Sequence, residues 1–109
     1  MIRLTFTGDS TIGGEDRLEG KDYSFHGYVR KHGYGYPYAN FREYFAQDDL
    51  TVTNLEGVLY DGTRGRADKP INFRGPTDYV NVLLEGSIEA AFLGNNHAMD
   101  YGAPGFEST

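Results

Sequence analysis

The sequence predicts an α/β fold built on a mainly parallel sheet. Three short segments have the pattern of strands, and a segment with the features of a helix follows each of them. Strands and helices that alternate along a chain usually form a parallel sheet, because each helix returns the chain to the same end of the sheet. We therefore predict the order strand, helix, strand, helix, strand, helix.

The composition indicates one folded domain. Of the 109 residues, 39% are hydrophobic and 15% are aromatic, which is enough for one packed core in a chain too short for two domains. The net charge of −6 argues against a general nucleic-acid-binding protein, which normally has a basic surface. Cysteine is absent, so disulfides and thiolate metal sites are excluded. Neither a secretory signal nor a membrane anchor is visible in the sequence.

The first strand is predicted at residues 2–7, where apolar and polar side chains alternate with the two-residue period of a strand. The sequence GDS at residues 8–10 is typical of a loop and is expected to end it. Residues 13–37 are rich in glycine, tyrosine and charge and have no clear period. We predict a long, partly ordered insertion there, with its aromatic segment packed as a lid or rim on the sheet.

The second strand is predicted at residues 50–55, which are rich in threonine and valine. Before it, Asn40 is expected to cap a helix whose aromatic side chains recur every three to four residues. After it, residues 56–75 are polar and rich in glycine, and we predict a loop.

The third strand is predicted at residues 89–93, between two further helices. Pro76 is expected to open the first of them and Gly86 to end it, with three residues on its apolar face: Val80, Leu83 and Leu84. Pro104 is expected in the first turn of the last helix. Because the sequence ends within this helix, we expect residues 1–109 to be the N-terminal portion of one larger domain.

Each predicted strand ends on polar residues that can bind a ligand: Asp9 after the first, Asn54 and Glu56 after the second, and Asn95, Asn96 and His97 after the third. In open parallel sheets, ligands bind at the carboxyl ends of the strands. Oxygen and nitrogen donors without thiols favour Mn, Fe, Zn or Mg, and the imidazole favours a transition metal. Each residue alone also has an ordinary explanation as a turn, a solvated side chain or a helix cap. Their occurrence at three successive strand ends is the stronger indication of function.

Three stretches also resemble a known family. FTGDS (residues 6–10), DDLTVTNLEG (residues 48–57) and GNNHAMDYGAPGFEST (residues 94–109) are similar to the poly-gamma-glutamate capsule synthesis protein family of the CapA type. The segment that connects the last two fits the spacing of that family, so the resemblance covers almost the whole chain. The family is similar in turn to the calcineurin-like metallophosphoesterases. The resemblance therefore implies the N-terminal part of a metallophosphoesterase-like α/β sandwich.

The resemblance implies a divalent metal, with Mn, Fe or Zn as the candidates. Asp9 takes the place of the metal ligand that ends the first strand in the related enzymes. Asn54 and Glu56 match the ligands at the second strand, and Asn96 matches the asparagine ligand of the Gly-Asn-His motif. The usual Asp-x-His is altered here, because its third position is Thr11, so one imidazole ligand is missing.

The same comparison implies roles in catalysis and substrate binding. His97 takes the place of the histidine that steadies the scissile phosphate, and Asp100 is expected to orient it through a hydrogen bond. Separately, Arg74 lies between two loop signals and is predicted to bind a phosphate or carboxylate of the substrate with its planar guanidinium. The alternative for Arg74 is an ordinary surface arginine.

By resemblance, the protein helps to make or export an anionic polymer of the cell envelope, typically poly-gamma-glutamate, at the envelope or its extracellular face. We predict a metal-dependent, phosphoesterase-like hydrolase site that acts on this polymer or on a phosphoester. One alternative is a non-catalytic module that binds the polymer or assembles a membrane synthase complex. Another is a phosphoesterase unrelated to capsule. Half a sandwich exposes an apolar sheet face, so we also predict a homo-oligomer unless the missing half covers it.

Overall fold

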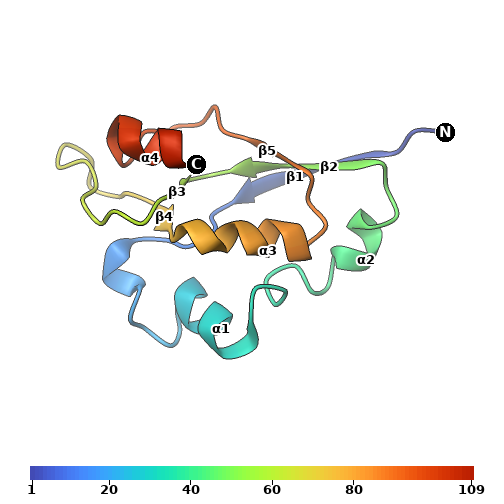
Figure 1. The fold of residues 1–109 in the computed structure, drawn as a ribbon, viewed down its shortest axis with the longest axis horizontal. Helices are drawn as coiled ribbons and strands as arrows, with labels where there is room; N and C mark the ends of the chain where they lie inside the picture. The colour runs from blue at the N-terminus through green and yellow to red at the C-terminus, as the bar shows by residue number, and fades with distance from the viewer.

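The computed structural model describes all 109 residues and confirms an α/β fold with parallel sheets (Figure 1). Strands β1 (Leu4–Ser10), β2 (Leu50–Leu55) and β5 (Ala90–Phe92) form a three-stranded parallel sheet in the order β1-β2-β5. A second parallel sheet pairs β3 (Val58–Leu59) with β4 (Arg74–Gly75).

Four helices and two short 3-10 turns accompany the sheets: α1 (Phe25–His32), α2 (Arg42–Phe45), α3 (Val80–Glu85), α4 (Gly102–Ser108), η1 (Asp16–Leu18) and η2 (Thr77–Tyr79). Helices α1 and α3 lie on one side of the three-stranded sheet, and α4 lies on the other side, near one end (Figure 1). None of the helices has the length and apolar character needed to cross a membrane.

The core lies between the three-stranded sheet and the helices α1, α2 and α3. Alternate residues of β2 face this side, and Thr51, Thr53 and Leu55 are at most 3% exposed. The main cluster of buried apolar residues consists of Ile12, Val29, Phe45, Leu55, Leu59, Tyr79, Val82, Leu83 and Ile88. One face of the sheet therefore supplies most of the packing.

The opposite face of the sheet is open over much of its length. The strand register places Phe6 beside Val52 and Asn54 beside Phe92, on the face away from the buried threonines. Phe6 is 71% exposed and Phe92 is 60% exposed. This apolar, solvent-facing surface agrees with the uncovered sheet face expected from the sequence. The self-association predicted from it stays a prediction.

Several predicted elements are confirmed. The second strand has the predicted bounds, and β5 lies within one residue of the predicted third strand at each end. Gly86 follows the last residue of α3, and Pro104 lies in the first turn of α4. The order of the elements around the three-stranded sheet is therefore the predicted one.

The prediction of a long, partly ordered insertion without a helix at residues 13–37 was wrong in one respect, because the segment contains helix α1. Ser24 caps this helix, and its side-chain oxygen accepts a hydrogen bond from the Gly27 amide at 3.1 Å. The buried residues of α1 are His26, Gly27 and Val29. A histidine and a glycine on the buried face give no apolar repeat, which explains why the sequence concealed the helix.

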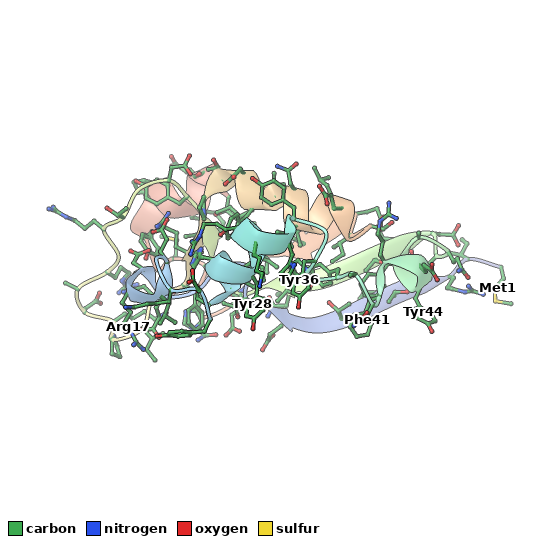
Figure 2. The ribbon with its side chains drawn as sticks, turned by 90° about the horizontal axis from the view of Figure 1, so that it is seen from below. Met1, Arg17, Tyr28, Tyr36, Phe41 and Tyr44 are labelled. Carbon is green, nitrogen blue, oxygen red and sulfur yellow. The ribbon has the colours of Figure 1, made fainter.

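The aromatic side chains of residues 23–38, which include those of α1, are of two kinds. Tyr34 and Tyr38 pack against the core, as expected for a segment that covers the sheet. Tyr28 and Tyr36 project into solvent, where their rings stack with centroids 5.8 Å apart (Figure 2). The predicted packing on the core is confirmed for only part of the segment.

Three other boundaries differ from the prediction. Strand β1 does not end before Gly8 but continues to Ser10, with an irregularity in its register between Phe6 and Asp9. Helix α2 is a single turn that begins at Arg42, so Asn40 does not cap it. The predicted loop at residues 56–75 contains β3 and β4, which at two residues each are too short to show a strand period.

The buried face of α3, the helix predicted to begin at Pro76, also differs from the prediction. Val82 and Leu83 are buried, whereas Val80 is 42% exposed and Leu84 is 65% exposed. The helical segment begins with the 3-10 turn η2, which has about three residues per turn and so changes the phase of the following side chains. The apolar face predicted for a continuous α-helix is therefore rotated around the helix axis relative to the face that is buried in the structure.

Candidate functional site

The candidate site lies where the carboxyl ends of β1, β2 and β5 meet. The arrowheads of β1 and β2 point toward the end of the molecule where α4 lies (Figure 1). Asp9 of β1 is the register partner of Asn54 of β2, and its Oδ1 accepts a hydrogen bond from Asn54 Nδ2 at 2.7 Å. Asn54 Oδ1 in turn accepts one from Asn95 Nδ2 at 2.9 Å. The structure thus joins residues from all three predicted strand ends.

Asn95 connects the sheet to the turn that carries His97. Its Nδ2 also donates to the Leu55 carbonyl at 2.8 Å, and its Oδ1 accepts from the His97 amide at 2.9 Å. The sequence analysis assigned the ligand role to the next residue, Asn96, which is exposed. Asn95, which the sequence places among the polar residues after the third strand without a specific role, therefore joins the sheet to the histidine turn.

His97 and Asp100 form the hydrogen bond that the sequence analysis predicted. His97 Nδ1 lies 2.6 Å from Asp100 Oδ2, and Asp100 is fully buried. The imidazole stacks on the Phe73 ring with centroids 4.2 Å apart and an interplanar angle of 24°. Its other nitrogen, Nε2, lies 3.6 Å from Glu56 Oε1. One edge of the ring is thus held by Asp100, and the other faces a carboxylate at the end of β2.

Lys69 is a further residue of this cluster. Its Nζ pairs with Asp100 Oδ1, donates to the Asn96 main-chain carbonyl at 2.7 Å and lies 3.4 Å from His97 Nδ1. From the sequence, Lys69 has only a weaker claim than Arg74 to pair with an anionic group. No local pattern marks it, and only the fold brings it to Asp100.

Arg74 lies apart from this cluster in a buried ion-pair network. Its side chain is 3% exposed, with Nε 2.9 Å from Asp16 Oδ1 and Nη2 3.0 Å from Glu19 Oε2, and Nη1 donates to the Tyr60 carbonyl at 2.8 Å. Burial lowers the pKa of Arg74, but the hydrogen bond and charge of Asp16 and the charge of Glu19 together raise it above its ordinary value. These contacts hold β4 against η1. The substrate-binding role of Arg74 stays a prediction.

The donors at the strand ends have the chemistry of a divalent metal site. The carboxylates of Asp9 and Glu56 and the imidazole of His97 are groups that Mn, Fe and Zn accept as ligands. The structure brings no three histidine, aspartate or glutamate side chains together closely enough to hold a metal ion. Asp9 is instead bonded to Asn54. These residues would therefore provide part of a coordination shell.

Comparison with known proteins agrees with the motifs at these strand ends. The PGA biosynthesis protein CapA of Bacillus subtilis (strain 168) is 35% identical over 66 residues, which make up 60% of this chain and 17% of that protein. The chain thus matches only a small part of the length of this relative. The family model described as bacterial capsule synthesis protein PGA_cap matches residues 3–109. The chain therefore belongs to the bacterial capsule synthesis family PGA_cap, as its motifs predicted.

Proposed function

We propose that this protein acts in capsule biosynthesis and that the strand-end residues form part of a metal-dependent, phosphoesterase-like hydrolase site. Membership of the PGA_cap family and similarity to the PGA biosynthesis protein CapA support the first part. One observation carries the second part. A continuous series of hydrogen bonds joins Asp9, Asn54, Asn95, His97 and Asp100 across three strand ends.

The arrangement of His97 is suited to the transfer or stabilisation of charge. Nδ1 lies 2.6 Å from Asp100 Oδ2, so the imidazole is fixed in orientation with Nε2 facing away from the buried carboxylate. From this position His97 would hold an anionic oxygen of a bound phosphoester or exchange a proton with it. Glu56, 3.6 Å from Nε2, would act beside it as a ligand or as a base.

The proposed metal ligands are Asp9, Asn54, Glu56 and Asn96. A bound Mn, Fe or Zn ion would supply positive charge for the phosphoryl oxygens and lower the pKa of a bound water. The substrate would be a phosphoester or the anionic polymer itself. The place of action, by family resemblance, would be the cell envelope or its extracellular face.

A specific observation also favours a second function. Asp9, Asn54 and Asn95 are bonded to one another and to the main chain, as in a scaffold whose polar groups serve to hold the loops. In that case the protein would be a non-catalytic module that binds an anionic polymer or helps to assemble a membrane synthase complex.

Hydrolysis of a generic phosphodiester with added Mn²⁺ tests the catalytic proposal. His97→Ala is expected to lower kcat/KM by about 100-fold or more, the usual contribution of a positioned acid or base. His32→Ala, at the exposed end of α1, is the matched control and should retain the wild-type rate. Equal activity of His97→Ala and wild type would contradict the proposal. Polyglutamate binding without hydrolysis by wild type would favour the second function.

A further inference from the structure

We propose that Lys69 is the positioning residue of His97 and that the segment 66–73, which carries it, fixes the imidazole of the site. The proposal rests on the proposed function, which gives His97 its role in the site. It assigns a role to a residue that lies 28 positions from His97 in sequence and outside the three strand ends. Three sets of contacts support it.

The first set joins Lys69 to the buried carboxylate. Asp100 is fully buried and accepts hydrogen bonds on Oδ2 from His97 Nδ1 and from the Phe73 amide, both at 2.6 Å. Lys69 pairs with the other oxygen, Oδ1. A buried carboxylate is costly without an opposite charge, and Lys69 supplies that charge from a side chain that is 25% exposed. The carboxylate therefore has donors on both oxygens.

The second set joins Lys69 to the main chain of the histidine turn. Its Nζ donates to the Asn96 carbonyl at 2.7 Å, directly before His97. Asn95 Oδ1 accepts from the His97 amide on the same turn. The ammonium thus connects Asn96, directly before His97, with Asp100, three residues after His97. One cation therefore holds the main chain before His97 and the carboxylate that faces its imidazole.

The third set comes from the rest of the segment. The Phe73 ring stacks on the imidazole, and the Arg66 amide donates to the Asp100 carbonyl at 2.9 Å. A neutral imidazole carries its hydrogen on either Nδ1 or Nε2, and its hydrogen bonds decide which. With Asp100 held by Lys69, the hydrogen of the neutral ring lies on Nδ1, and Nε2, 3.6 Å from Glu56 Oε1, carries the lone pair. Without Lys69, Oδ1 of the buried carboxylate would lose both its donor and its opposite charge, and the carboxylate would no longer be held in this orientation.

The tautomer of His97 in the 109-residue chain is the direct test. Long-range ¹H–¹⁵N spectra at about pH 8, above the ordinary histidine pKa, are expected to show the hydrogen on Nδ1 in wild type. In Lys69→Met, the His97 nitrogen shifts should move toward the mixed-tautomer values of free imidazole. Lys69→Arg keeps a positive donor and should stay near wild type. Lys31→Met, an exposed lysine of α1, is the matched control and should leave His97 unchanged.

Either of two results would overturn the proposal: wild-type His97 with its hydrogen on Nε2, or a folded Lys69→Met with unchanged His97 shifts. Should Lys69→Met fail to fold, the wild-type tautomer and the spectrum of Lys69→Arg still test the proposal. Titration with Mn²⁺ separates this proposal from the proposed function. Lys69→Met should bind about 10-fold more weakly, as removal of a residue that orients a site commonly does. Wild type that binds no Mn²⁺ would refute the metal site and leave the spectroscopic test intact.

Discussion

At the scale of single residues, the surrounding contacts distinguish two residues that the sequence places among the site candidates. Both Arg74 and His97 were assigned to substrate or catalysis. Arg74 is enclosed by Asp16, Glu19 and a carbonyl, so its guanidinium is already satisfied. His97 is satisfied on one edge only, and its Nε2 remains directed at Glu56. The residue with an unused polar edge is the better candidate for chemistry.

A second histidine, His26, is buried for a structural reason. It is 1% exposed, its Nδ1 lies 2.9 Å from the Tyr79 hydroxyl, and its Nε2 has no hydrogen-bond partner. Burial lowers the pKa of His26 below its ordinary value of 6.5, and the charge of Glu19 opposes part of this effect. The neutral imidazole is therefore the form that the fold accommodates.

This shift predicts a contribution to the dependence of stability on pH. The contribution of neutral His26 is present above pH 6.5, the unfolded value, and is lost as the pH falls through the lowered pKa of the folded chain. Between about pH 7 and about pH 5, His26→Gln should lose less free energy of unfolding than wild type. Urea denaturation at both pH values measures this. Equal losses of free energy of unfolding in wild type, in His26→Gln and in the exposed control His32→Gln would contradict the prediction.

At the scale of elements, the sequence predicted best where residues that favour strands filled a whole segment. Strand β2 was predicted to the residue from its threonines and its valine, and in the structure Thr51, Thr53 and Leu55 are its buried positions. Helix α1 was missed because no apolar repeat exists around His26 and Gly27. In the site, the bond between His97 and Asp100, three residues apart, was expected from the family resemblance. Lys69 was not, since 31 residues separate it from Asp100.

Helix α1 shows how much a short helix depends on its cap. Ser24 accepts from the Gly27 amide and donates to the Lys21 carbonyl at 2.6 Å. We expect Ser24→Ala to lower the free energy of unfolding by about 1 kcal/mol, as loss of an N-cap usually does. Ser24→Thr keeps a hydroxyl at this position and should lose less. Chemical denaturation of the three proteins measures the difference, and equal stability of wild type and Ser24→Ala would refute the capping role.

At the scale of the whole molecule, the packing divides the sheet into two unlike faces. Helices α1, α2 and α3 cover one face, and Phe6 and Phe92 remain in solvent on the other. The candidate site lies at the end of the sheet, where β1, β2 and β5 finish together. Its position there follows from the parallel order of the strands, which the sequence predicted.

The central claim is that the strand-end residues bind a divalent metal, and elemental analysis of protein purified without chelator tests it most directly. We predict about one or two equivalents of Mn, Fe or Zn in wild type, and less in Glu56→Gln. Glu43→Gln, an exposed glutamate of α2, is the matched control and should keep the wild-type content. Absence of metal from wild type, or equal content in Glu56→Gln, would contradict the claim and favour the polymer-binding module.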